Sequence, residues 1–245
     1  METVKTARQL IEQAKALGRL ALDEPTSKQV LKEYGIHSPQ SLVIQVNEDI
    51  KTALQKLSLP VVLKLVSPDV LHKSDFGGVV LGLSTVDAIQ SAIDDMTKRC
   101  RESGYTIDGF LLEEMAGKGH EIVIGGYSDE TFGPVIMFGL GGIFVEVLQD
   151  VTFRICPITE VDAREMIHEL RGHALLKGAR GGVSVSDQVL IDTLLAVGGE
   201  HGLFFELKDL IKELDINPLL ASDQGVIALD ARIVLAKNLK YEDCV

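Results

Sequence analysis

The segment that most constrains the fold of this chain runs from Glu213 to Ile233 and reads ELDINPLLASDQGVIALDARI. Two alternating apolar runs flank a polar turn, a pattern that predicts two antiparallel strands joined by that turn. A tight turn sets the pairing register, and this register places Asn217 opposite Asp230. Because side chains alternate between the two faces of a strand, Asp215 shares a face with Asn217. The hairpin is therefore expected to present three oxygen donors on one side.

Carboxylate and amide oxygens are the ligands that Mg²⁺ prefers, with water and phosphate oxygens completing its shell. Asp215, Asn217 and Asp230 are therefore the candidate metal ligands. The alternative is that they are ordinary polar residues of a solvent-facing strand. Zinc is disfavoured, because no cluster of histidines and cysteines in the sequence has ligand spacing. We interpret the histidines of the C-terminal half as residues without partners: His168, His173 and His201.

A second candidate site lies in residues 64–79, KLVSPDVLHKSDFGGV. Lys64 ends a short β-branched run that is typical of a buried strand, so we expect it to point out of that strand beside a mobile loop. Gly77 and Gly78 have no Cβ atoms, which allows their backbone N–H groups to approach a phosphate. The alternative is a plain hairpin turn preceded by a solvated histidine, His72.

A third segment, residues 109–127, predicts a strand at 110–112, a glycine turn and a return strand at 122–124. The acidic stretch between the strands offers backbone donors and acceptors for an adenine edge, an apolar side chain for its ring, and carboxylates for amino or ribose groups. The candidate nucleotide contacts are Glu113, Glu114, Met115 and Glu121. The alternative is a β-hairpin whose acidic side chains face water.

The remaining pattern alternates amphipathic helices with short β-branched strands, which predicts an α+β (α/β) chain of two lobes, residues 1–120 and 121–245. Helices are expected at 3–19, 25–35, 49–57, 86–103, 160–170 and 186–200, and further strands at 42–46, 79–83, 134–139 and 151–155. The motif FGLGGIF is not a dinucleotide fingerprint, because the residues after it predict a strand instead of a helix.

Composition narrows the function. The formal net charge is −12, and no basic cluster with aromatic residues is present, which disfavours nucleic-acid binding. Anionic substrates would need a local positive site, and Lys64, Lys73 and Arg180 are the candidates. The three cysteines are widely separated, so we expect reduced thiols and a cytoplasmic protein. No apolar run approaches the ~20 residues needed to span a bilayer, and the charged N-terminal helix is unlike a signal peptide.

Four motifs in sequence order resemble those of the ATP-grasp fold, and more narrowly those of the ATP-grasp (beta) subunit of the NDP-forming acyl-CoA synthetases, also called ADP-forming acetate–CoA ligases. The motifs are SPDVLHKSDFGGVVLG (67–82), FGPVIMFGLGGIFVEVLQDVTFRICPI (132–158), LLKGARGG (175–182) and ELDINPLL (213–220). The resemblance extends from about Leu22 to Lys237. It implies two lobes that clamp a nucleotide, ATP or ADP, with Mg²⁺.

The resemblance also implies residue roles. The histidine of the HKS motif is a phosphorylation site in the family, which assigns a phosphoryl relay to His72. Lys64 would neutralise nucleotide phosphates, with Lys73 and Arg180 as further phosphate contacts. Asn217 and Asp230 correspond to the family's magnesium ligands, with Asp215 in or near the shell.

Many members of this family fuse the ATP-grasp domain to CoA-binding and ligase domains, and 245 residues hold neither. The resemblance therefore implies a separate alpha subunit that carries CoA binding and the first phosphohistidine, in an αβ or α₂β₂ assembly. Two other classes fit the residues: an ATP-grasp ligase that joins a carboxylate to an amine, and a non-catalytic regulatory subunit.

Overall fold

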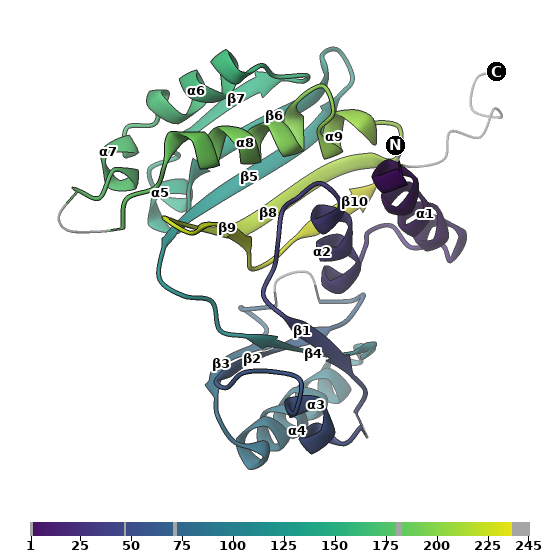
Figure 1. Cartoon of the computed structure of the whole chain (residues 1–245). Helices are drawn as coiled ribbons and strands as arrows, with labels where there is room; N and C mark the ends of the chain where they lie inside the picture. Colours follow the sequence, from purple (N-terminus) through teal and green to yellow (C-terminus); the bar gives the residue numbers. More distant parts are fainter. Residues whose placement is uncertain (1, 47, 71–72, 180–182, 237–245) are drawn as a thin grey trace, which may run out of the picture. The chain divides into compact units, whose positions relative to one another are not determined.

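A computed structural model describes the chain except for residues 1, 47, 71–72, 180–182 and 237–245 (Figure 1). The chain divides into two compact units. The smaller unit is Pro39–Gly117, and the larger unit joins Met1–Ser38 to Lys118–Val245. Among the described residues, no helix has both the length and the apolar character that crossing a membrane requires.

The smaller unit is an antiparallel sheet of four strands with the order β1-β4-β2-β3. The strands are β1 (Ser41–Ile44), β2 (Val61–Val66), β3 (Val79–Leu83) and β4 (Gly109–Glu114), and the helices are α3 (Ile50–Leu54) and α4 (Val86–Ser103). Both helices lie on the same face of the sheet (Figure 1). Ile89, Ile93 and Met96 of α4 are buried in one apolar cluster with alternate residues of β2 and β4. All six residues of β2 are buried, so its second face is shielded from solvent as well.

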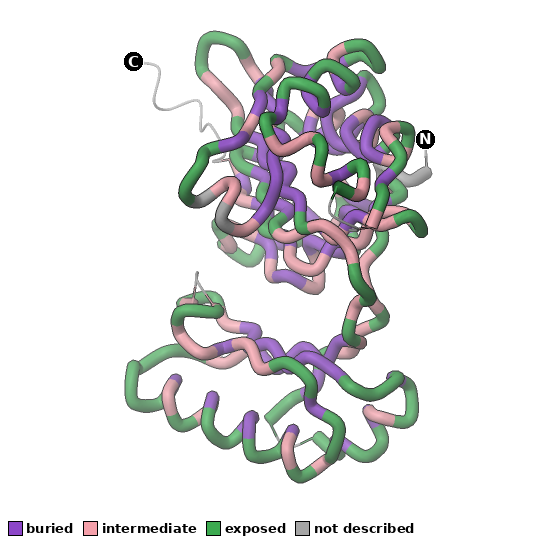
Figure 2. The backbone as a smooth tube through the Cα atoms, turned by 90° about the vertical axis from the view of Figure 1, so that its left-hand side faces the viewer, coloured by how far each residue is buried: buried purple, intermediate pink, exposed green. Residues whose placement is uncertain are grey.

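The larger unit contains a six-stranded antiparallel sheet with the order β10-β8-β5-β6-β7, and β9 pairs with β8 beside this path. The strands are β5 (His120–Asp129), β6 (Gly133–Leu140), β7 (Val151–Ile155), β8 (Ile211–Ser222), β9 (Gly225–Ala228) and β10 (Arg232–Leu235). The helices are α1 (Glu2–Ala16), α2 (Glu24–Glu33), α5 (Ile143–Glu146), α6 (Glu160–Glu169), α7 (His173–Leu176), α8 (Asp187–Gly198) and α9 (Leu203–Glu206). Buried segments run through the inside of each unit (Figure 2).

The expected lobe of residues 1–120 is wrong at its N-terminal end, because α1 and α2 do not belong to the smaller unit. They belong to the larger unit, where Ile11 of α1 and Leu31 of α2 are fully buried in its core. Leu22 N–H donates to the Ile233 carbonyl at 2.9 Å, which ties the connection between the helices to β10. An amphipathic helix reveals that it has an apolar face, but its sequence does not say which sheet that face will cover.

The alternative of a β-hairpin across residues 110–124 is wrong. β4 belongs to the smaller sheet, whereas β5 pairs with β6 and β8 in the larger one. The Gly117–Gly119 stretch therefore spans the boundary between the two units instead of closing a hairpin. In addition, a four-residue helix, α5, follows β6 where the β-branched pattern predicted a strand.

The cysteines within the described residues support the expectation of reduced thiols. Cys100 and Cys156 are both free and buried. Burial raises the pKa of the Cys156 thiol to about 12. A thiol with so high a pKa is protonated near neutral pH and is therefore a poor nucleophile.

Candidate functional site

Lys64 lies in the middle of β2, on the sheet face opposite the helices. β2 and β4 are antiparallel, with Val62 opposite Glu113 and Lys64 opposite Leu111, so Lys64 and Glu113 are diagonal neighbours on one face. Lys64 Nζ donates to Glu113 Oε1 at 2.7 Å, and the two side chains are only 8% and 2% exposed. Two residues that the sequence assigned to separate nucleotide contacts are thus joined in a buried ion pair.

The glycine pair before β3 forms a tight, internally bonded turn. Gly77 has φ +71° and its N–H donates to the Ser74 carbonyl at 3.0 Å, while Gly78 N–H donates to the Lys73 carbonyl at 2.6 Å. The Arg99 guanidinium donates to the Gly77 carbonyl at 2.6 Å. In this conformation both glycine N–H groups that were expected to approach a phosphate are engaged in the turn. His72 lies outside the described residues.

The acidic stretch at the end of β4 is also engaged in local structure. The Glu114 carboxylate accepts from the Ser58 N–H at 2.7 Å. Glu114 N–H donates to the Gln40 carbonyl at 2.9 Å, and Met115 N–H to the Pro60 carbonyl at 3.3 Å. The Met115 side chain is 42% exposed, as an apolar surface for a ring would need to be. Two of the backbone donors expected to read an adenine edge, the N–H groups of Glu114 and Met115, are therefore paired in this conformation.

Glu121 belongs to the larger unit, at the start of β5, and its side chain is exposed. Its carbonyl accepts from Gly141 N–H at 2.7 Å. A Cβ atom on Gly141 would lie 2.8 Å from the Glu121 Cβ, and one on Gly139 would lie 2.7 Å from a Val151 methyl group. These two glycines are therefore required by strand packing. Arg180 lies outside the described residues.

The register of the C-terminal hairpin agrees with the sequence prediction. Ser222 pairs with Gly225 at the turn, and Leu219 with Ala228 in the ladder. Further along β8, Asp215 pairs with Arg232 of β10 in the same register. Asp230 lies between β9 and β10, outside the paired strands, so its position opposite Asn217 stays a prediction that this register supports.

The three oxygen-bearing residues of this hairpin fit a hard divalent cation. Asp215 and Asn217 are exposed and alternate with buried residues along β8, so they share its outer face. Desolvation by neighbouring atoms and the negative charge of Asp230 raise the pKa of Asp215, and the charge of Arg232 opposes this shift. The Asp215 carboxylate thus lies close to a second carboxylate, although Asp215 as a whole is exposed to solvent. A bound cation would stabilise two neighbouring carboxylates.

The three histidines that we expected to lack partners each lie near a carboxylate, and His201 Nδ1 is 3.5 Å from Glu206 Oε1. His168 and His173 form a cluster with Asp187. His168 Nε2 lies 3.2 Å from Asp187 Oδ2, and the rings of His168 and His173 are 4.7 Å apart. The three residues come from α6, α7 and α8, and their spacing in the sequence matches no metal motif. Only the packing of these helices brings them together.

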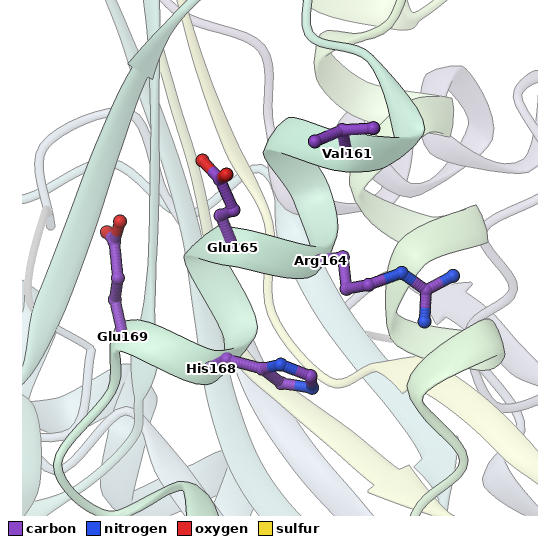
Figure 3. Close-up of a pocket in the computed structure, with 5 residues that line it drawn as sticks. All are labelled: Val161, Arg164, Glu165, His168 and Glu169. Atoms are coloured by element: carbon purple, nitrogen blue, oxygen red, sulfur yellow. The ribbon is translucent and has the colours of Figure 1, made fainter.

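A shallow hollow lies on the outer face of α6 (Figure 3). Its lining residues all come from that helix: Val161, Arg164, Glu165, His168 and Glu169. Among the described residues, none of the candidate phosphate or magnesium contacts lines it, and the lining carries both signs of charge. We therefore do not assign the nucleotide to this hollow.

Comparison with known proteins extends over nearly the whole chain. The ATP-grasp domain model matches residues 13–235. The chain is 42% identical to the beta subunit of acetate–CoA ligase (ADP-forming) I of Pyrococcus furiosus, over 96% of this chain and 100% of that protein.

Solved structures of related proteins share the fold of this chain. The dinucleotide forming acetyl-coenzyme A synthetase 1 of Ca. Korarchaeum cryptofilum, in complex with coenzyme A, Ca-AMPCP and HgCl⁺, is 36% identical with a TM-score of 0.86. The same synthetase with coenzyme A and Mg-AMPPCP, whose phosphohistidine segment points towards the nucleotide binding site, is 36% identical with a TM-score of 0.78. Each match covers 94% of this chain and 100% of the matched chain.

Proposed function

Because this chain belongs to the ATP-grasp family, and within it to the beta subunits of the ADP-forming acetate–CoA ligases, we propose that its residues perform the nucleotide half of that reaction. The chain is the nucleotide-binding beta subunit of an ADP-forming acyl-CoA synthetase. The observation that carries this conclusion is the match to a beta subunit over 96% of this chain and 100% of that subunit.

The proposed reaction is a balanced phosphoryl relay. An acyl-CoA and inorganic phosphate exchange CoA for phosphate to give an acyl phosphate and free CoA. The acyl phosphate transfers its phosphoryl group to a histidine of the partner and leaves as the free acid. The phosphoryl group then moves to this subunit and finally to ADP, which becomes ATP. In the opposite direction the enzyme activates an acid at the expense of ATP.

Lys64 supplies positive charge to the nucleotide phosphates in this proposal. Phosphoryl transfer depends mainly on positioning and on stabilising charge spread over the phosphoryl oxygens. Glu113 supports this role, because its carboxylate holds Lys64 Nζ at 2.7 Å in a fixed, buried position. Lys73 and Arg180 are assigned as further phosphate contacts by their place in the family's motifs.

Asp215, Asn217 and Asp230 would hold Mg²⁺. When bound, the ion would neutralise charge on the phosphate oxygens of the nucleotide. The shared outer face of β8 and the raised pKa of Asp215 support this assignment. His72 would accept and pass on the phosphoryl group through an imidazole nitrogen, which is nucleophilic near neutral pH.

Replacement of Asp230 by asparagine is expected to weaken Mg²⁺-dependent nucleotide binding by roughly 10–100-fold or more, because outer-shell changes at metal sites already cost that much. Calorimetric titration of ADP at several Mg²⁺ concentrations measures the effect. Asp223→Asn is the matched control, since Asp223 is exposed in the turn of the same hairpin. Without Mg²⁺, Asp230→Asn should also lower the pKa of Asp215, because it removes the charge that helps to raise it. Unchanged ADP affinity at every Mg²⁺ concentration would contradict the ligand assignment.

The partner is proposed to be a separate alpha subunit that carries CoA binding and the first phosphohistidine, in an αβ or α₂β₂ assembly. Support comes from the beta-subunit name of the relative from P. furiosus, which this chain covers completely. The isolated chain should therefore make no ATP from acetyl-CoA, phosphate and ADP. Adding the candidate alpha subunit should give one ATP for each CoA released, measured by a luciferase assay and a thiol assay. Turnover by the isolated chain would contradict this division of labour.

A further inference from the structure

Three side chains that can bind a metal converge within the larger unit, and none of them belongs to the hairpin of β8. His168 lies in the last turn of α6, His173 is the first residue of α7, and Asp187 is the first residue of α8. α6 lies against both α7 and α8 (Figure 1). The available nitrogen and oxygen atoms of the three side chains all lie within 4.8 Å of one another.

The positions of these side chains are determined by local capping. Thr159 and Asp162 form a capping box at the start of α6, and the Ser186 hydroxyl caps α8. The buried Asp150 carboxylate accepts from the N–H groups of Arg171 and Gly172, at 2.8 Å each, immediately before α7. His173 and Asp187 therefore project from helix starts that are held in place without any ion, and α6, which carries His168 in its last turn, is capped at its start.

His173 carries a polar atom that the rest of the described chain does not satisfy. Its Nε2 is shielded from solvent and makes no hydrogen bond within the described residues. The nearest carboxylate oxygen, Asp187 Oδ1, is 3.8 Å away. A buried ring nitrogen without a hydrogen bond is energetically unfavourable. A cation between His173 Nε2 and Asp187 Oδ1 would bind both atoms.

We propose that His168, His173 and Asp187 bind a transition-metal ion of the Zn²⁺ class. Bonds of about 2.0–2.1 Å in a tetrahedral shell place ligand atoms roughly 3.3 Å apart. His168 Nε2 lies 3.2 Å from Asp187 Oδ2, and His173 Nε2 lies 3.8 Å from the other oxygen, Oδ1. With one ligand atom taken from each side chain, the three atoms lie within 4.8 Å of one another, so small side-chain movements would bring them to that spacing. Two imidazoles and one carboxylate suit Zn²⁺ better than Mg²⁺, and they leave a fourth position for water. The site is independent of the proposed phosphoryl relay.

Lys177 competes with the metal for Asp187. Its Nζ lies 2.6 Å from Asp187 Oδ1, so the ammonium group balances the carboxylate charge when no ion is bound. Despite desolvation, hydrogen bonds from Lys177 and His168 lower the pKa of Asp187, which keeps it ionised as a ligand must be. The Lys177 side chain is 40% exposed, so its charged end can turn to solvent when an ion arrives.

An ion can reach the site through His168. The His168 side chain is 48% exposed and lines the hollow on α6, where it projects to the same side of the helix as Arg164 (Figure 3). The Arg164 guanidinium is paired with Glu160 at 2.9 Å, which offsets its repulsion of a cation. The site is therefore partly open, and a bound ion would link α6, α7 and α8.

The test is a titration of the chelator-stripped full chain with ZnCl₂, in competition with a chromophoric chelator and with excess MgCl₂ to saturate the β8 hairpin. We expect one Zn²⁺ per chain. His173→Ala and Asp187→Asn should each reduce the affinity by more than roughly 100-fold. His201→Ala should leave it unchanged, because the His201 side chain is 88% exposed and outside the cluster. Lys177→Met should increase the affinity by about tenfold, since it removes a competing positive charge.

Two results would overturn the site. One is equal Zn²⁺ affinity of the wild-type chain and a His173→Ala variant whose circular dichroism is native. If that variant does not fold, the absorption spectrum of the wild-type chain with added Co²⁺ tests the site instead. Four-coordinate d–d absorption without a thiolate charge-transfer band supports the site, whereas the spectrum of hydrated Co²⁺, or a thiolate band, overturns it.

Discussion

The Glu113→Leu variant is expected to lose about 3–5 kcal/mol of stability in the smaller unit, because it removes the buried carboxylate that the Lys64 ammonium contacts at 2.7 Å. Lys64 and Glu113 have only 8% and 2% of their side chains exposed, so water cannot replace the missing partner. Lys64→Met is expected to be similarly destabilising, since a buried charge remains in that variant as well. The Lys64→Met/Glu113→Leu double variant should be more stable than either single variant, because no uncompensated charge of the pair remains.

The same three variants separate stability from function. Because the two units need not unfold together, hydrogen exchange of β2 and β4 is the appropriate measurement, with urea unfolding followed by circular dichroism beside it. The double variant should retain exchange protection in β2 yet lose measurable ADP binding in calorimetry, since the positive charge proposed for the phosphates is gone. Val43→Met is a matched control, because Val43 is exposed on β1 of the same sheet. A double variant that binds ADP as tightly as the wild type would contradict the role of Lys64.

The second large effect is expected at His72, whose replacement by alanine should abolish phosphorylation of the chain. The purified chain is mixed with Mg²⁺ and γ-³²P-ATP, and the label is tested for the acid lability and base stability of phosphohistidine. An imidazole nitrogen is the group whose nucleophilicity near neutral pH suits this relay, and alanine has no replacement for it. The expected result is label in the wild type and none in His72→Ala.

His201→Ala serves as the control for this experiment, because it removes an exposed histidine elsewhere in the chain. ADP affinity is measured in each variant, so that loss of label is not confused with loss of nucleotide. If the wild type alone carries no label, the candidate alpha subunit is added and the labelling repeated. Label retained in His72→Ala would contradict the relay, and no label with the partner present would favour a carboxylate–amine ligase.

The ATP-grasp fold, the beta-subunit family and the acyl-CoA ligase activity, all predicted from four motifs, are confirmed by the comparisons. Most helices and strands lie within a few residues of their expected positions. The residue roles at His72, Lys64 and the β8 hairpin stay predictions that the experiments above test.

The sequence by itself determined the local elements, because turn chemistry, capping residues and hydrophobic period act over a few neighbouring residues. The pairing of Ser222 with Gly225, and the shared face of Asp215 and Asn217, follow from that local chemistry. The tertiary structure alone decided which elements meet. It placed α1 and α2 in the larger unit, and it paired β5 with both β6 and β8.

Tertiary packing also decided which side chains become partners. It joined Lys64 to Glu113 across adjacent strands, and it brought His168 and His173 to Asp187. These contacts link residues that are far apart in the chain or on separate helices, so no local periodicity encodes them. They arise because apolar faces must be buried somewhere, and the element that covers each face is chosen by the packing of the whole chain.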